Sequence, residues 1–212
     1  MTGAADADDR PTPEDLQAWH VLRPLLDEGG YLPWDTGAMR PAGLVLVCNE
    51  IMYANATSVV ECGSGASTIV LARLLRRRGA GALTAVEHDE AWAARVRDLL
   101  RREQLDAVAT VLHAPLTGEP AWYDNTVLEG ALPAAVDLLV VDGPPAFEPQ
   151  DAHRRLPALT FFEPRLADDA TVFLDDVDRA GERDVLARWE DTTAWRFEVA
   201  ARTGVARGRR RR

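Results

Sequence analysis

Two acidic residues and two glycines are spaced along the chain as expected for recognition of a nucleoside. The segment Val59–Thr68 is apolar up to Glu61, has glycines at positions 63 and 65, and leads into an apolar stretch with helical spacing. Glycines there allow the backbone to turn tightly and a ligand to approach it closely. Glu87 ends the next apolar run, where a carboxylate can accept hydrogen bonds from ribose hydroxyls. The pattern predicts a nucleoside-cofactor site at the first turn of an open α/β sheet.

The kind of nucleoside follows from two departures from the dinucleotide fingerprint. That fingerprint, G-x-G-x-x-G, has a third glycine where this chain has Thr68. Glu61 also lies two residues before Gly63, where its charge would repel a pyrophosphate on the helix N-terminus. S-adenosylmethionine (SAM) carries a cationic amino group and a ribose but no phosphate, so it suits this sequence better than NAD. An NAD-dependent oxidoreductase is the less favoured alternative.

The E-x-G-x-G sequence followed by Glu87 resembles motifs I and II of class I SAM-dependent methyltransferases. The resemblance extends over roughly residues 30–209 to the bacterial family called methyltransferase domain 24, through segments His113–Leu116, Trp122–Asp124, Leu156–Leu159 and Phe173–Arg179. It implies a SAM-dependent methyltransferase, although members of this family act on diverse substrates. A SAM-binding regulatory or partner protein without turnover is the alternative from a different class.

The expected cofactor contacts lie where the strands of an open α/β sheet end, because ligands of such sheets bind at the carboxyl ends of the strands. We expect Glu61 near the amino group of SAM, through backbone or water, and Glu87 at the ribose. The segment after the third strand would line the adenine pocket. The residues expected to bind the cofactor are Glu61, Gly63, Gly65, Ser67, Thr68, Glu87, His88, His113, Ala114, Pro115 and Asp142.

A second group of acids, Asp142, Asp175 and Asp176, follows the fourth and fifth expected strands. Adjacent strand ends would bring these carboxylates within reach of one hard cation such as Mg²⁺ or Ca²⁺. The three acids resemble the metal site of catechol-type and macrolide-sugar O-methyltransferases, in which the cation holds substrate oxygens and lowers the pKa of a hydroxyl group. In the alternative interpretation, Asp176 or Asp178 caps the next helix and Asp142 contacts SAM without a metal.

The general base is the feature in which the chain departs from those metal-dependent families. They often have Lys or His three residues after the strand-four Asp, and position 145 here is Pro. We therefore expect catalytic roles for Asp142 and for the loop residue His153, with Asp178 and Glu148 as further candidates for the base. The expected reaction is transfer of a methyl group to a small-molecule acceptor, at a hydroxyl oxygen.

The elements that position these residues follow from the spacing of apolar runs. Strand-like runs end 26, 26, 29 and 33 residues apart, near Glu61, Glu87, His113, Asp142 and Asp175. This spacing is close to the ~30 residues of a βαβ unit, and helical patterns at 67–78 and 90–103 separate the first runs. The first strands are apolar on both faces, as buried parallel strands are.

The last two strands must be antiparallel neighbours, because the three residues between Trp195–Ala201 and Val205–Arg209 cannot hold a crossover helix. The prediction is an α/β fold with a Rossmann-like, seven-stranded, mostly parallel sheet, a C-terminal antiparallel hairpin and helices on both faces. The family resemblance implies that the final strand is inserted before the sixth.

The expected organisation has four parts. Residues 1–12 are expected to be disordered, 13–57 to hold two helices and a loop, 58–209 to form the methyltransferase domain, and 210–212 to be an arginine-rich tail. The loop at 29–40 is either a lid over the cofactor pocket or a plain surface connection. The two apolar helices either pack on the sheet or form a homodimer contact. Trp34, Trp122 and Tyr123 are candidates for the wall of the acceptor pocket.

Charge and composition exclude several classes of protein. All 24 basic residues are arginine, and the absence of lysine excludes a P-loop or Schiff-base enzyme. The net charge is −10, and the tail ending at Arg212 is expected to end an edge strand and fray. Because the chain is acidic apart from its arginine-rich end, it repels polyanions, and general nucleic-acid binding is not expected. The chain has no apolar run that suits a membrane or a signal peptide, which predicts a cytoplasmic protein.

Overall fold

The computed structural model of the protein describes residues 11–35 and 37–211. Its main sheet is formed by β1 (Ser58–Cys62), β2 (Ala82–Glu87), β3 (Ala109–His113), β6 (Val136–Val141), β7 (Leu166–Leu174), β8 (Trp195–Val199) and β9 (Ala206–Arg210). Their order is β3-β2-β1-β6-β7-β9-β8. The first five are parallel, and β9 is antiparallel to both β7 and β8. The predicted fold class is confirmed, including the insertion of the final strand. A separate hairpin pairs β4 (Leu116–Thr117) with β5 (Trp122–Tyr123).

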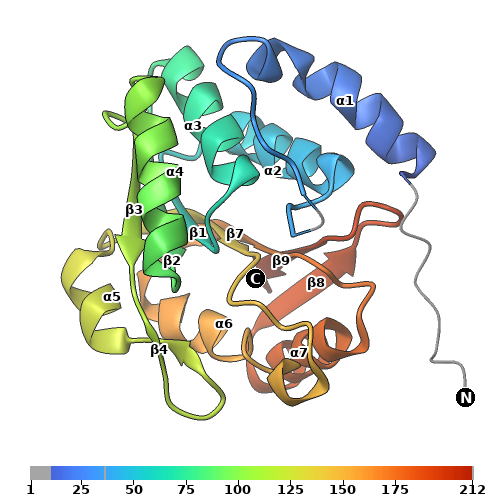
Figure 1. Cartoon of the computed structure of the whole chain (residues 1–212). Helices are drawn as coiled ribbons and strands as arrows, with labels where there is room; N and C mark the ends of the chain where they lie inside the picture. Colours follow the sequence, from blue (N-terminus) through green and yellow to red (C-terminus); the bar gives the residue numbers. More distant parts are fainter. Residues whose placement is uncertain (1–10, 36, 212) are drawn as a thin grey trace, which may run out of the picture.

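Helices cover both faces of the sheet (Figure 1). The α-helices of the described residues are α1 (Pro13–Leu26), α2 (Pro41–Tyr53), α3 (Ala66–Arg78), α4 (Glu90–Arg102), α5 (Asn125–Ala131), α6 (Pro157–Phe162) and α7 (Ala180–Thr192). Short 3₁₀ turns lie at Pro149–Asp151 and Glu163–Arg165. Helices α1 to α4 contribute to one buried apolar cluster, and α5 to α7 contribute to the cluster on the opposite face. Because both faces are covered, the central strands are mostly apolar on both sides.

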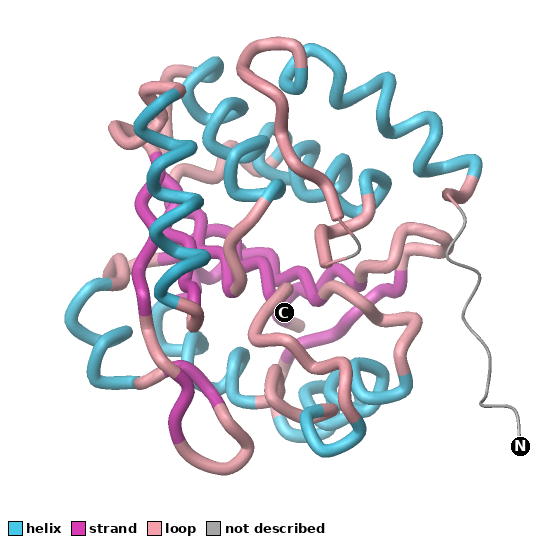
Figure 2. Tube along the Cα trace, in the orientation of Figure 1, coloured by secondary structure: helices cyan, strands magenta, loops and turns pink. Residues whose placement is uncertain are grey.

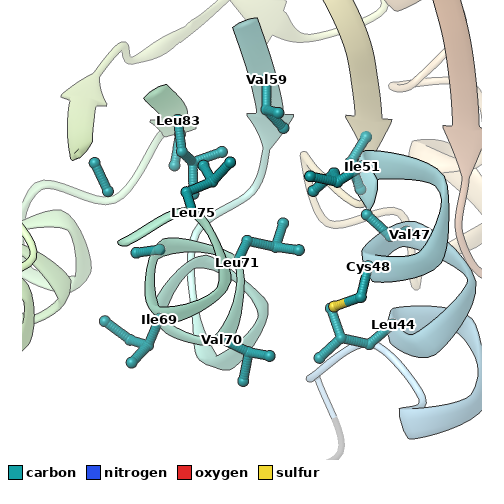
Figure 3. Packing of buried hydrophobic residues seen from close by; sticks show 14 of the residues in the cluster. Leu44, Val47, Cys48, Ile51, Val59, Ile69, Val70, Leu71, Leu75 and Leu83 are labelled. Atoms are coloured by element: carbon teal, nitrogen blue, oxygen red, sulfur yellow. The ribbon is translucent and has the colours of Figure 1, made fainter. Parts of the chain in front are cut away.

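Of the two amino-terminal helices, α2 packs on the sheet, which is the first of the two arrangements expected for them, and α1 packs on α2 and α3. Leu44, Val47 and Ile51 of α2 are fully buried and lie in one cluster with Val59 of β1 and Leu71 of α3 (Figure 3). Their burial explains why α2 is so apolar. A homodimer contact stays a prediction.

Helix α1 begins with a capping box that orders the end of the segment expected to be disordered. The hydroxyl of Thr12 accepts a hydrogen bond from the backbone of Asp15, whose carboxylate accepts one from the backbone N–H of Thr12. Such reciprocal bonds satisfy amides that would otherwise lack partners at the start of a helix. Thr12 is therefore ordered, whereas residues 1–10 lie outside the described part of the chain.

The arginine-rich end of the chain is not an edge strand, so that expectation was wrong. Strand β9 lies between β7 and β8, and β8 forms the edge. The physical reason is charge pairing as well as backbone pairing. Glu50 of α2 is buried, and its carboxylate lies 2.7 Å from the guanidinium of Arg209 and 3.6 Å from that of Arg207.

Among the described residues, no helix has the length and apolar character needed to span a bilayer.

Candidate active site

A cavity of about 400 Å³ opens where β1, β2, β6 and β7 end. Four segments after these strands contribute to its wall, and the loop between α1 and α2 contributes a fifth part. The residues that line it are Gly63, Ser64, Gly65, Ala66, Ser67, Glu87, His88, Asp89, Trp92, Tyr123, Asp142, Gly143, Pro145, Phe147, Arg155, Asp175, Asp176, Arg179, Pro33, Asp35, Gly37 and Ala38. The predicted location at the carboxyl ends of the strands is therefore where the structure has its cavity.

The two glycines of the loop after β1 differ in backbone conformation and in surroundings. Gly63 has a φ of +89°, and a Cβ atom there would lie 3.1 Å from the backbone nitrogen of Gly143. Gly63 is thus required by its left-handed conformation and by the close approach of the loop after β6. Gly65 has open space where a Cβ atom would be. Because Gly65 lines the cavity, this space is available to a ligand.

Glu61 lies behind the glycine loop and does not line the cavity. It is fully buried, and the hydroxyl of Thr68 donates a hydrogen bond to its carboxylate. Thr68 in turn accepts a bond of 2.9 Å from the backbone N–H of Gly65. Burial raises the pKa of Glu61 to about 8. Of the expected contacts here, Ser67 lines the cavity, whereas Glu61 and Thr68 hold the loop in place from behind.

Glu87 lines the cavity at the end of β2 and accepts hydrogen bonds with both carboxylate oxygens. Ser64 donates its backbone N–H and its hydroxyl to Oε2, at 3.1 and 3.0 Å. The backbone N–H groups of His88 and Asp89 donate to Oε1, at 2.8 and 3.0 Å. Burial alone would raise the pKa of Glu87, but the hydrogen bond with the His88 ring, whose Nδ1 lies 2.8 Å from Oε1, and the backbone bonds from Asp89 and Ser64 outweigh it and lower the pKa below its usual value. Glu87 is therefore a carboxylate at neutral pH.

The segment expected to form the adenine pocket lies beside the cavity and is not among its lining residues. The ring Nε2 of His113 is 3.1 Å from the carbonyl oxygen of His88. Ala114 is buried and donates its backbone N–H to the carbonyl of Glu87, while Pro115 is exposed. His88 thus stands between this segment and the cavity. An adenine contact for His113, Ala114 and Pro115 stays a prediction.

The three aspartates that follow β6 and β7 do come together. Each of Asp142, Asp175 and Asp176 offers a carboxylate oxygen, and these oxygens lie within 4.8 Å of one another. Burial raises the pKa of Asp142 to about 6, and the negative charge of Asp176 adds to the effect. The pKa of Asp175 is raised well above its usual value by burial and by the charges of the other two. The cluster therefore holds a proton more readily than exposed acids would.

Arg155 sits among these acids, and the sequence analysis did not single it out. Its side chain is 2% exposed, and its Nη2 lies 3.0 Å from Oδ2 of Asp176 and 3.6 Å from Oδ1 of Asp142. A second arginine, Arg179, lies 2.8 Å from Asp176. Arg155 belongs to a loop without hydrophobic periodicity, so no local pattern points to its burial. The sequence feature that could have pointed to Arg155 as a site residue is its positive charge in the segment that follows Asp142.

The alternative that an aspartate caps α7 is wrong, because the N-cap residue is Arg179 and no side chain caps the helix. The catalytic role expected for His153 also needs correction. Its Nε2 lies 2.6 Å from Oδ2 of Asp184 on α7, and His153 is not among the cavity residues. The turn after Pro149–Asp151 directs the ring toward α7. Of the two catalytic candidates, Asp142 is the one that lines the cavity.

The loop between α1 and α2, whose path Figure 2 shows, contributes Pro33, Asp35, Gly37 and Ala38 to the cavity wall. A lid role for this loop stays a prediction. Trp34 does not contribute to the cavity wall. Its ring packs edge-on against Trp19, with the centroids 4.8 Å apart. Tyr123 lines the cavity as expected, and Trp92 of α4 was missed because its spacing matched the apolar face of a helix. The Trp92 indole donates to the carbonyl of Ser64 at 2.7 Å.

Comparisons with known proteins agree with this geometry. Residues 60–177 match the family model Methyltransf_24, described as a methyltransferase domain. The cofactor-bound Rv0187 from MTB superposes with a TM-score of 0.67 at 19% identity, covering 95% of this chain and 99% of that one. The SAH-bound methyltransferase PaMTH1 of Podospora anserina gives 0.64 at 13% identity, with 95% and 89% covered. The O-methyltransferase TomG of Streptomyces achromogenes, in complex with SAM, gives 0.59 at 16% identity, with 95% and 91% covered. No curated protein sequence matches this chain.

The structural neighbours share the fold at low identity, and the family match covers most of the chain segments that build the cavity. It runs from within β1 to the loop after β7, and it covers more than half of the 212 residues. The four strands whose ends line the cavity all fall in this range. The chain therefore belongs to the Methyltransf_24 family of methyltransferase domains.

Proposed function

We propose that the protein transfers a methyl group from SAM to a hydroxyl oxygen of a small-molecule acceptor. The observation that carries the proposal is the composition of the cavity wall. One part consists of the glycine loop and Glu87, and the other part is the acidic cluster with Asp142. A nucleoside and an acceptor can thus share one cavity with a carboxylate between them. Solved structures with the same fold hold SAM or S-adenosylhomocysteine (SAH).

In the proposed complex, the methionine part of SAM lies along the loop from Gly63 to Ser67, where Gly65 leaves space. Glu87 accepts hydrogen bonds from the ribose hydroxyls. These hydroxyls take the place of one of the protein groups that donate to Glu87 without the ligand. Glu61 orients the loop through Thr68, and its carboxyl group lies within the reach of a water or backbone bridge to the amino group. SAM carries no phosphate group, so the complex needs no phosphate site.

Methyl transfer needs mainly alignment, because the sulfonium group already makes the methyl carbon electrophilic. The acceptor oxygen forms a bond to that carbon, the carbon–sulfur bond breaks, and its electron pair stays on sulfur as SAH leaves. Asp142 takes the hydroxyl proton as the base of the reaction. Alignment in a closed site contributes up to roughly 7–11 kcal/mol to lowering such barriers, so a weak base is sufficient.

The mouth of the cavity supports an acceptor with an apolar face. Phe147 is 61% exposed there, and the guanidinium carbon of Arg179 lies 4.7 Å from its ring centroid. The exposed Phe147 ring thus offers an apolar surface at the rim of the cavity. A flat acceptor on Phe147 would bring a hydroxyl toward Asp142 deeper in the cavity.

The divalent cation expected from the acidic cluster does not fit the arrangement of side chains. Mg²⁺ or Ca²⁺ would need oxygens of Asp142, Asp175 and Asp176 at about 2.0–2.6 Å. The guanidinium of Arg155 already contacts two of these carboxylates. We therefore propose methyl transfer without a metal step.

Ligand binding and turnover test the proposal separately. Thermal unfolding is measured with SAH and with NAD, since a specific ligand raises the apparent stability by mass action. We expect SAH to raise Tm and NAD to leave it unchanged; the reverse would favour an oxidoreductase. Conversion of SAM to SAH is then followed with a panel of phenolic, sugar and amine acceptors. Binding of SAH with no turnover on any acceptor would favour the non-catalytic SAM-binding alternative.

A further inference from the structure

We propose that Arg155 is a built-in cation of the active site, which takes the place of a divalent metal among Asp142, Asp175 and Asp176. Its role in methyl transfer rests on the function proposed above, whereas the exclusion of a divalent cation does not. Arg155 is a positioning residue, because it acts through the carboxylates that it holds at the edge of the cavity.

The first argument is the position of the guanidinium. Nη2 of Arg155 lies 3.0 Å from Asp176 and 3.6 Å from Asp142, and Nη1 lies 3.7 Å from Glu182. One positive group thus touches acids from the ends of β6 and β7 and from the start of α7. The ends of β6 and β7 are the segments that a shared metal ion would have to join. Arginine stays charged in proteins, so it can do this permanently.

The second argument is that Arg155 cannot easily leave. Its side chain is 2% exposed, and it donates hydrogen bonds to the backbone carbonyls of Asp142, Pro144 and Asp175. Those at Pro144 and Asp175 measure 3.2 Å each. Swinging the side chain out would leave three carbonyls and several carboxylates without their donor. Buried polar and charged groups without a partner destabilise the folded state.

The third argument is electrostatic. A dication held at about 2.0–2.6 Å from the same carboxylate oxygens would lie next to the guanidinium, within about 6 Å. Repulsion between them in a buried site is far stronger than in water. The acidic cluster therefore already has two guanidinium groups, the buried Arg155 and the half-buried Arg179, and it disfavours a dication beside them. The guanidinium also holds the backbone of Asp142 through the hydrogen bond to its carbonyl, which a loosely bound ion would not do.

The structure also offers a matched control in Arg73, a second buried arginine far from the acidic cluster. Arg73 is fully buried, donates to the backbone carbonyl of Leu25, and pairs with Glu103 at 2.6 Å. Replacing either arginine removes a buried guanidinium with carbonyl and carboxylate partners. Only the replacement of Arg155 would free a set of three clustered carboxylates.

The test is Mn²⁺ binding to the full chain, measured by electron paramagnetic resonance without any methyl acceptor. We expect no specific site in the wild type, and a gain of at least about tenfold in Mn²⁺ affinity for Arg155→Met, because the repelling charge is gone. Arg73→Met should gain nothing, and Arg155→Lys, which keeps a charge, should stay close to the wild type. Adding Asp176→Asn to Arg155→Met should abolish the new site.

Two results would overturn the inference. One is a wild-type Mn²⁺ site that is lost in Asp176→Asn but kept in the exposed control Asp169→Asn, and this arm holds even if Arg155→Met fails to fold. The other is a folded Arg155→Met that gains no Mn²⁺ site. SAH formation from SAM in excess EDTA gives a separate readout, expected to be unchanged. Absence of SAH binding would count against the proposed function. The Mn²⁺ measurement would still test the exclusion of a divalent cation, because it does not depend on the cofactor.

Discussion

Ser64 and Glu87 join the glycine loop after β1 to the end of β2, because Ser64 donates both its backbone N–H and its hydroxyl to the same oxygen of Glu87. The two residues lie 23 positions apart in the chain. Both residues line the cavity, and their contact fixes the carboxylate that we assign to the ribose. Cofactor affinity should therefore depend on Glu87 more than on any surface acid.

Replacement of Glu87 by Ala should weaken SAH binding by about 1.5–3 kcal/mol, as expected when hydrogen bonds to a charged group are lost. Isothermal titration calorimetry at pH 7 measures the effect. Glu129→Ala, an exposed acid on α5, is the control and should leave the affinity unchanged. An unchanged SAH affinity in Glu87→Ala would show that the ribose lies elsewhere.

The two glycines of the loop should respond differently to alanine. Gly63→Ala forces a side chain onto a left-handed residue beside Gly143, so we expect it to lower the free energy of unfolding by about 1–3 kcal/mol. Gly65→Ala adds a methyl group to open space and should leave stability nearly intact while it weakens SAH binding. Urea unfolding and calorimetry separate the two effects. Equal stabilities for both variants would contradict this assignment.

Glu61 should make the stability of the protein depend on pH. Its pKa is raised from 4.5 to about 8 in the folded state, so between these values unfolding releases a proton. Stability from this group is present below pH 4.5 and is lost as the pH rises toward about 8, with a slope of up to about 1.4 kcal/mol per pH unit. Glu61→Gln should lack this decline. Parallel unfolding profiles for the two proteins between pH 5 and 8 would rule out a neutral Glu61.

Asp142 should set the acid limb of the pH–rate profile. Its pKa is raised to about 6, and the base form needed to take the acceptor proton is lost below that pH. We expect kcat at saturating SAM to fall as the pH drops below about 6, and Asp142→Asn to lower kcat by about a hundredfold or more. The acid limb should disappear in this variant. An identical limb in Asp142→Asn would assign the base to another group.

Most of the fold followed from local patterns in the sequence. Runs apolar on both faces could only be buried parallel strands, and the three-residue link after Ala201 could only join antiparallel neighbours. The glycines and acids at strand ends then located the cavity, because a parallel sheet brings its carboxyl ends together. Errors arose where a residue was assigned from its neighbours in sequence alone, as for His153, which turns toward Asp184.

The sequence by itself determined the parallel sheet, the place of the cavity and the three acids that approach one another, because strand spacing and the end of each strand are local properties. Three facts were decided only by the tertiary structure. The backbone at Gly143 approaches Gly63 too closely for a side chain there, Glu61 lies behind the loop, and Arg155 neutralises the acids. These facts depend on contacts between segments far apart in the chain, or on the path of an irregular loop, and neither leaves a periodic signal. The physical chemistry of the site is thus decided by packing and charge pairing across the ends of β1, β6 and β7.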